Sequence, residues 1–306
     1  MRLRYSWRLD ASPHPPFDEC RGFAGWVAGR NTRHRLLVEA TSEGGGAPLV
    51  AVAYHHDGPA DWRPDARLRR AMRQLAAMRA DLAPGFPTPV RVEHWAFPEK
   101  RKMPRPGETV GAQHVNGGCT RRGDTIHCYR QEQYPKVWLH EAAHAFGIDH
   151  HSSAAPSELT RALRAALPTT APLLPNEAWA ELVAGAYSTA CIPGAAFGSR
   201  RWKAAWATET EHAFAQAGAL CRHMGHARAE DIFRRPWRER TNALAYYVLR
   251  SALMPRPEEW PRVKSAADLV ALILERLRQP EFLARLQRGM DAPPARDRNL
   301  RMTARA

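Results

Sequence analysis

The sequence predicts an α+β protein, with a small mixed sheet in the first half of the chain and helices alone in the second half. Short β-type runs bounded by turn residues lie before residue 131, whereas apolar residues recur at helical spacing after residue 135. With 306 residues, 44% of them hydrophobic, the chain can bury a good core. We expect a sheet-containing subdomain over residues 1–150, a helical subdomain over 151–290 and a disordered tail over 291–306.

The elements of the first half follow from local patterns. Residues 1–30 are rich in proline and aromatic residues and show little periodicity. Leu68, Met72, Leu75 and Met78 recur at helical spacing, which predicts an amphipathic helix over 65–82 with its arginines outside. Strands are predicted over 35–40, 49–54 and 90–97, the first two joined across a glycine-rich turn, and a hairpin is predicted within 112–130.

The second half opens with the helix that carries the most specific motif of the chain. Pro135 fits its first turn, where the missing N–H costs nothing, and Gly147 can end it with a positive φ. Asn176 can cap a later helix, and Ser265 with Asp268 forms a capping box. Helices are therefore predicted over 135–147, 159–167, 176–190, 201–223, 241–253 and 265–277, with a short one from 280.

Residues 140–150 read His-Glu-Ala-Ala-His-Ala-Phe-Gly-Ile-Asp-His, an HExxH motif that continues into GxxH. His140 and His144 lie four residues apart, so on an α-helix their imidazoles project from one face and can hold one Zn²⁺. Glu141 lies beside them, placed to take a proton from a water on the metal. Gly147 lets the chain turn back and present His150. The motif predicts a zinc hydrolase.

A catalytic zinc usually takes three protein ligands, and two resemblances imply different third ligands. The motif resembles the metzincin pattern, and residues 147–152 look like its matrixin version, which implies His150. The chain departs from metzincins because no methionine lies between His150 and Met224. Residues 176–181 resemble the glutamate helix of gluzincins, which implies Glu177 as the third ligand. Glu181, on the same helix face, would then accept an N–H from one of the two motif histidines. We place His150 ahead of Glu177, because its spacing arises less often by chance.

Four segments resemble zinc peptidases of large nucleocytoplasmic DNA viruses: residues 116–118, 129–141, 177–181 and 241–247. The order of elements also resembles the zincin arrangement, in which a sheet lies beside the HExxH helix and a helical half closes the cleft. These resemblances imply a viral zinc peptidase that hydrolyses a peptide or protein substrate through a zinc-activated water. Glu141 would be the general base, and the strand before the helix would align the substrate by strand addition.

The formal net charge is +14, carried almost wholly by arginine. A phosphate-binding surface is one interpretation, but a solvated basic surface is favoured because no RNA-binding signature accompanies the charge. The alternative to a peptidase is a catalytically silent, zinc-stabilised structural or virion-associated protein. Such a protein would bind nucleic acid or an acidic partner through its arginines.

The five cysteines are sparse and include no CxxC pair, so they indicate neither a disulfide framework nor a cysteine-ligated zinc site. Cys119 and Cys128 flank a predicted turn, and either a bond between them or two thiols fits the pattern. The first residues contain no apolar secretory core, and no apolar run approaches the ~20 residues of a membrane span. We therefore expect a soluble protein in the cytosol of a host cell, or in a virion if the chain is viral.

Overall fold

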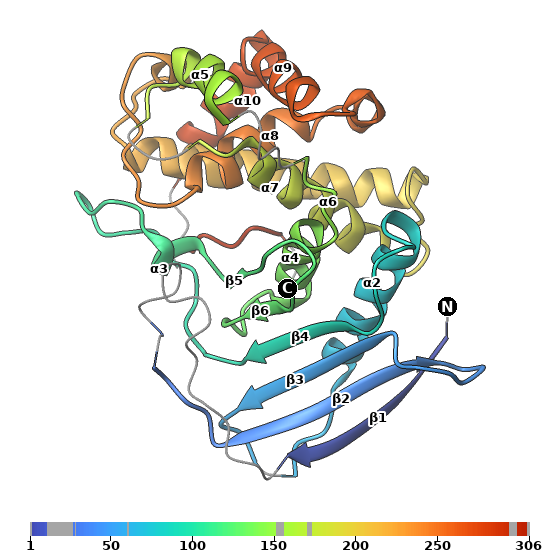
Figure 1. Cartoon of the computed structure of the whole chain (residues 1–306). Coiled ribbons are helices and arrows are strands. Elements are labelled where there is room, and N and C mark those ends of the chain that lie inside the picture. The colour runs from blue at the N-terminus through green and yellow to red at the C-terminus, as the bar shows by residue number, and fades with distance from the viewer. Residues whose placement is uncertain are drawn as a thin grey trace. The chain divides into compact units, whose positions relative to one another are not determined.

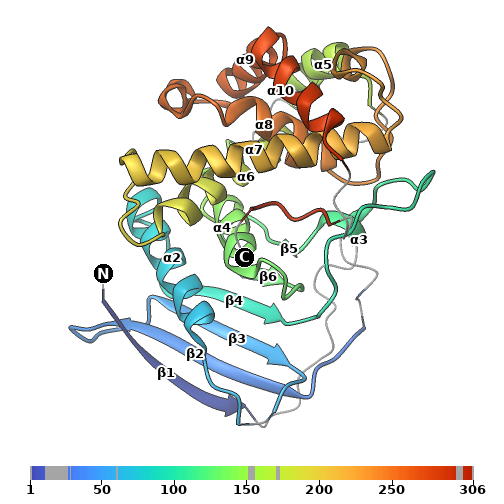
Figure 2. The same ribbon diagram turned by 180° about the vertical axis from the view of Figure 1, so that it is seen from behind.

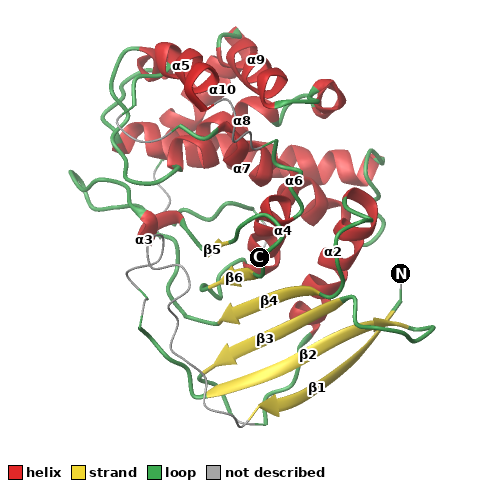
Figure 3. Cartoon of the chain, in the orientation of Figure 1, coloured by secondary structure: helices red, strands yellow, loops and turns green. Residues whose placement is uncertain are grey.

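The computed structural model describes residues 2–10, 27, 29–59, 61–150, 156–169, 173–293 and 299–304. They confirm the α+β class, with an N-terminal sheet followed by helices (Figures 1 and 3). The chain forms two compact units. The first comprises Met1–Lys100 and Asn116–Ile148, and the second comprises Arg101–Val115 and Asp149–Ala306. None of the helices in these described ranges combines the length and the apolar character needed to cross a bilayer.

The first unit is built on a six-stranded sheet with the order β1-β2-β3-β4-β6-β5. The pairs β3–β4 and β4–β6 are parallel, and the pairs β1–β2, β2–β3 and β6–β5 are antiparallel. The strands are β1 (Leu3–Asp10), β2 (His34–Ser42), β3 (Val50–His56), β4 (Val90–Trp95), β5 (Gly118–Cys119) and β6 (Ile126–Cys128). The three predicted strands and the hairpin are thus confirmed.

Strand β1 lies within residues 1–30, where no regular element was predicted. It forms one edge of the sheet and pairs along its whole length with β2. Leu3, Tyr5, Trp7 and Leu9 alternate with polar residues. This period of two is typical of a strand, and the prediction of little periodicity over residues 1–30 is wrong for this segment. Its side chains are nevertheless half-buried or exposed throughout, because β1 is an edge strand that pairs on one side only, with β2.

Two helices of the first unit pack on one face of the sheet, α2 (Ala66–Leu82) and α4 (Tyr134–Ala145) (Figure 2). Asp65 caps α2 by accepting the Leu68 backbone N–H over 2.7 Å. The side chains that α2 turns inward are fully buried, among them Leu68, Met72 and Leu75. This confirms the predicted amphipathic helix.

The two cysteines of the β5–β6 hairpin differ in oxidation state. Register places Cys119 opposite His127 and Gly118 opposite Cys128, so the two cysteines are not cross-strand partners. Cys128 is a buried free thiol, whereas Cys119 is disulfide-bonded. A bond between Cys119 and Cys128, which the sequence left open, is therefore not formed.

The second unit is helical. Its elements are α3 (Ala112–Val115), α5 (Pro156–Ala166), α6 (Pro175–Ala190), α7 (Arg200–His223), η1 (Ala229–Phe233), η2 (Leu244–Leu249), α8 (Arg250–Leu253), η3 (Pro257–Arg262), α9 (Ala266–Leu277) and α10 (Pro280–Asp291). The Ser265 cap of α9 is confirmed, since its hydroxyl accepts the Asp268 N–H over 3.2 Å. The helix predicted over 241–253 is confirmed, and it opens with a fully buried π-helical turn, η2, that continues into α8.

The cap predicted for α6 is wrong. The helix begins at Pro175 with Leu174 in the cap position, because proline at the first helical residue already has the required φ. Asn176 is inside the first turn and uses its amide differently, donating from Nδ2 to Asp149 Oδ2 over 3.2 Å.

Two segments of the second unit, near residue 101 and over residues 299–304, are held by contacts with residues far away in sequence. The basic loop near residue 101 pairs Lys102 with Asn299, and Leu300 N–H donates to the Arg101 carbonyl. Leu300 is fully buried, and Tyr247 donates its hydroxyl to the Leu300 carbonyl over 2.6 Å. Residues 299–304 are therefore packed, which corrects the expectation that the whole tail from 291 is disordered. Their packing depends on contacts with α7 and η2 that the tail sequence does not indicate.

A buried carboxylate caps the π-helical turn. Glu239 is 4% exposed, and its carboxylate accepts N–H bonds from Ala243 and, over 3.0 Å, from Leu244. Burial raises the pKa of Glu239 to about 8, although the two N–H bonds lower it. Desolvation therefore outweighs the favourable bonds, and the folded state holds this carboxyl in its protonated form at neutral pH.

We expect Glu239 to make the stability of the chain fall as pH rises between about 4.5 and 8. In that window the folded state binds a proton that the unfolded state has released, so the free energy of unfolding declines, by about 5 kcal/mol at the upper limit. The variant Glu239→Gln keeps an acceptor and has no charge. Thermal melts from pH 5 to 8 should show it gaining stability relative to wild type as pH rises. A constant difference across this range would contradict the assignment.

Candidate metal centre

Helix α4 presents the HExxH motif, and its two ends are formed as the sequence predicts. Pro135 lies in its first turn. At the other end Gly147 adopts a φ of +70°, its N–H donates to the His144 carbonyl, and the Ile148 N–H donates to the Ala143 carbonyl. These two bonds form a Schellman motif, which satisfies carbonyls at the end of the helix. The helix therefore stops directly after the second histidine.

The two motif histidines face each other. The Nε2 atoms of His140 and His144 are 3.1 Å apart, with the ring planes 79° from each other. Two nitrogens bound at about 2.05 Å to one tetrahedral zinc would be about 3.3 Å apart. The same separation also suits an N–H···N bond between neutral rings. His140 is buried and His144 is half-buried, so the pair is held in a defined position on the helix.

Glu141 is buried next to this pair and lies against the backbone of the edge strand β5. A Cβ atom added to Gly118 would be 2.8 Å from Glu141 Oε1, and equally close to the carbonyl oxygen of His127. Since real Cβ atoms do not approach this closely, only glycine fits at position 118. No role was predicted for Gly118, because nothing local to a Gly-Gly pair shows which side chain lies over it.

The buried face of α4 is fixed by a chain of hydrogen bonds. Trp138 donates from Nε1 to His94 Nδ1 over 3.3 Å, and His94 Nε2 lies 3.2 Å from Gln131 Oε1. Tyr54 donates its hydroxyl to the same amide oxygen over 2.9 Å. Burial lowers the pKa of His94 to about 3, so the ring stays neutral and can both accept from Trp138 and donate to Gln131. This chain of hydrogen bonds connects α4 to β3 and β4.

The remaining predicted site residues belong to the second unit. His150 has a φ of 56°, and its ring packs against Trp179 of α6 with 5.1 Å between the ring centroids. Burial lowers the pKa of His150, although Asp149 and Asp268 oppose this. The imidazole is therefore neutral near pH 7. His151 and Ser152, which completed the matrixin-like string, lie outside the described residues.

The two glutamates of α6 have different surroundings. Glu177 is in the first turn and half-buried. Glu181 is 4% exposed, and its Oε2 lies 3.1 Å from Nη1 of Arg250, whose side chain is almost fully buried. Breaking such a pair leaves a buried charge uncompensated. The Glu181 carboxylate is therefore held in place by Arg250.

No protein-family model matches the sequence, and no curated protein or solved structure matches the chain. Among the predicted residues, the first unit brings together His140, Glu141 and His144 on one helix. The second unit holds His150, Glu177 and Glu181.

Proposed function

We propose that this chain is a zinc-dependent peptidase. The observation that supports the proposal most strongly is the facing pair of Nε2 atoms on α4, whose 3.1 Å separation suits two nitrogen ligands of one tetrahedral zinc. The adjacent buried carboxylate of Glu141 supplies the proton acceptor that a hydrolase needs. A zinc ion, when bound, supplies a Lewis acid that polarises a carbonyl and makes water more acidic.

We propose Glu177, in preference to His150, as the third ligand. Two imidazoles and one carboxylate are a donor set that holds zinc in hydrolases, and residues 176–181 of α6 resemble the glutamate helix of gluzincins. The ring of His150 is instead in contact with Trp179. Arg250 keeps Glu181 in position. On the gluzincin resemblance, this carboxylate would accept an N–H from one of the two motif histidines.

Glu141 would act as the general base and acid. Its carboxylate would accept a proton from the attacking water and deliver it to the amine that leaves. Gly118 allows this carboxylate to lie against strand β5. The strand directly before the helix, β6, lies inside the sheet, so the prediction that it aligns the substrate is wrong. The edge strand is β5, and an extended peptide could pair with that strand instead. That peptide would then lie beside the general base.

Zinc counting in four variants tests the ligand set. Wild-type protein should contain about one zinc ion per chain by inductively coupled plasma mass spectrometry. His140→Ala and His144→Ala should each lose it, because two ligands do not hold zinc well. Glu177→Ala should lose most of the metal, and His150→Ala should keep it. Cleavage of denatured casein and of a quenched fluorescent peptide library is measured in parallel.

The outcomes separate the alternatives. Loss of zinc in His150→Ala with retention in Glu177→Ala would make His150 the third ligand and overturn our choice. Retention in both His140→Ala and His144→Ala would exclude a metal on α4. Zinc bound stoichiometrically without any peptide cleavage would favour a structural zinc protein over a peptidase. His223→Ala, which removes a histidine of α7 outside the motif, is the control.

A further inference from the structure

Strand β1 and helix α2 form a surface that the proposed peptidase chemistry does not use. We define the β1–α2 surface by Tyr5, Trp7 and Leu9 of β1 together with Arg69, Arg70 and Arg73 of α2. The three β1 residues pair with Ala40, Val38 and Leu36 of β2, whose side chains are buried in the core. Since side chains in register share a face, Tyr5, Trp7 and Leu9 lie on the face that α2 covers.

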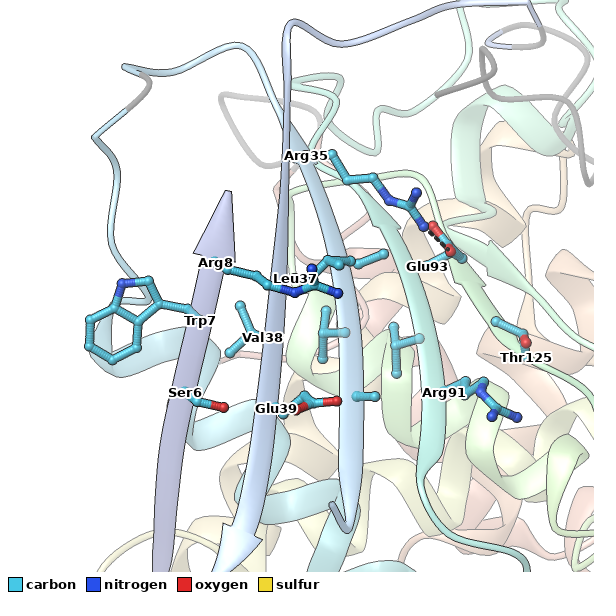
Figure 4. Close-up of a pocket in the computed structure, with 14 residues that line it drawn as sticks. Ser6, Trp7, Arg8, Arg35, Leu37, Val38, Glu39, Arg91, Glu93 and Thr125 are labelled. Atoms are coloured by element: carbon cyan, nitrogen blue, oxygen red, sulfur yellow. Dashed lines mark hydrogen bonds and ion pairs between the residues drawn. The ribbon is translucent and has the colours of Figure 1, made fainter. Parts of the chain in front are cut away.

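The apolar part of this surface is unusually exposed. Trp7 is 39% and Leu9 is 48% exposed, and they are two of the four large apolar side chains exposed among the described residues. Figure 4 shows Trp7 and its neighbour Arg8 leaving β1 in opposite directions, with Arg8 extending over the other face of the sheet. On that other face, Arg35 is paired with Glu93 over 3.2 Å.

The basic part of the surface lies on α2. Arg69 and Arg73 are four residues apart and Arg70 and Arg73 three apart, so they form one stripe of the helix. Arg70 and Arg73 are exposed. Within the ranges that the structure describes, none of the three is paired with an acidic residue, in contrast to Arg35. The first turn of α2 contains no acidic residue, so the positive charge of the stripe is not neutralised within the helix.

The aromatic and basic parts are in contact. The Arg69 guanidinium lies 5.9 Å from the Tyr5 ring centroid, and Tyr5 donates its hydroxyl to the Arg69 carbonyl over 3.1 Å. Successive side chains on this face of β1 are about 6.8 Å apart. Two of the three β1 side chains are aromatic, and Trp7 is the exposed one. An exposed ring beside uncompensated arginines suits single-stranded nucleic acid, because a base can stack on the ring and phosphates can meet the guanidinium groups.

We propose that the β1–α2 surface binds single-stranded nucleic acid without sequence preference. The arginines hold the phosphates, and Trp7 accepts a base on its exposed ring. This binding does not involve the proposed metal centre, so its test is independent of the test of the peptidase proposal. An anionic membrane surface would also attract arginine and tryptophan. The nucleic acid is favoured because Tyr5 and Trp7 lie on one face of a strand, with Tyr5 in contact with Arg69 of the charged stripe, instead of forming a protruding apolar tip.

Fluorescence anisotropy with a fluorescein-labelled oligothymidylate of about 15 nucleotides tests the proposal on the full chain. Removing two phosphate contacts in the double variant Arg70→Ala with Arg73→Ala should weaken binding roughly ten-fold near 0.2 M salt and flatten the salt dependence of log K by about 1.4. Trp7→Ala should weaken binding about five-fold or more and leave the salt dependence unchanged. Circular dichroism melts verify that each variant is folded.

The matched control is Arg234→Ala with Arg238→Ala, which removes two exposed arginines from the second unit. An equal loss of affinity in this control would overturn the proposal in favour of diffuse charge attraction. Binding to phosphatidylserine vesicles but not to the oligonucleotide would overturn it in favour of a membrane surface. Oligonucleotide binding that Trp7→Ala leaves intact would remove the stacking role and also contradict it.

Discussion

Glu141→Gln is expected to keep its zinc and to lose peptide hydrolysis by about 100-fold to 10,000-fold, the range that a positioned general base contributes. Glutamine has nearly the same shape as glutamate, so it fits the space against Gly118, where Glu141 Oε1 lies 2.8 Å from the position of an added Cβ. It cannot accept a proton at neutral pH. The change therefore removes the proton transfer and leaves the metal ligands in place.

Zinc content and cleavage of the quenched peptide library are measured on the same preparations. Glu39→Gln is the control, because it neutralises an exposed carboxylate on the other face of the sheet. Full activity in Glu141→Gln would exclude Glu141 as the base. Loss of zinc from this variant would instead show that the carboxylate supports the metal site, and the proposed division of roles on α4 would be wrong.

Gly218→Ala and Gly289→Ala are each expected to destabilise the second unit by about 3 kcal/mol or more. Helices α7 and α10 cross at these two glycines. A Cβ on Gly218 would lie 2.2 Å from the backbone carbon of Gly289, and one on Gly289 would lie 2.2 Å from the Phe214 carbonyl oxygen. Both obstacles are backbone atoms, so only separation of the helices relieves the overlap. That loss exceeds the roughly 1 kcal/mol of helix propensity that alanine gains over glycine.

Gly185→Ala is the matched control for the glycine pair. It lies inside α6 and gains the same propensity, but its added Cβ would meet only the Trp206 ring at 3.4 Å, an ordinary contact. Chemical denaturation should show this variant close to wild type. The double variant of Gly218 and Gly289 should lose less than the sum of the single losses, because one separation of the helices relieves both overlaps. Equal stability of Gly218→Ala and Gly185→Ala would contradict the close crossing.

Elements with a strong period of their own were predictable from the sequence. Helix α2 and strand β3 carry their apolar residues at helical or strand spacing and have turn residues at their ends, so local physics is sufficient for them. Strand β1 also has this alternation, with apolar residues at 3, 5, 7 and 9, so it was predictable and was missed. The sequence did not show that its partner in the sheet is β2. Residues 299–304 look like a polar tail, but Leu300 is buried because α7, η2 and residue 101 surround it.

The sequence by itself determined the motif helix: its 3.6-residue period puts His140 and His144 on one face with Glu141 beside them, and Gly147 ends it. Only the tertiary structure decided that Gly118 lies against Glu141, that Glu181 is paired with Arg250, and that Cys119 is opposite His127. The reason is the sequence separation over which each kind of interaction acts. Helical spacing and turn chemistry act within a few residues, whereas these contacts join segments whose approach depends on how the whole chain buries its apolar surface.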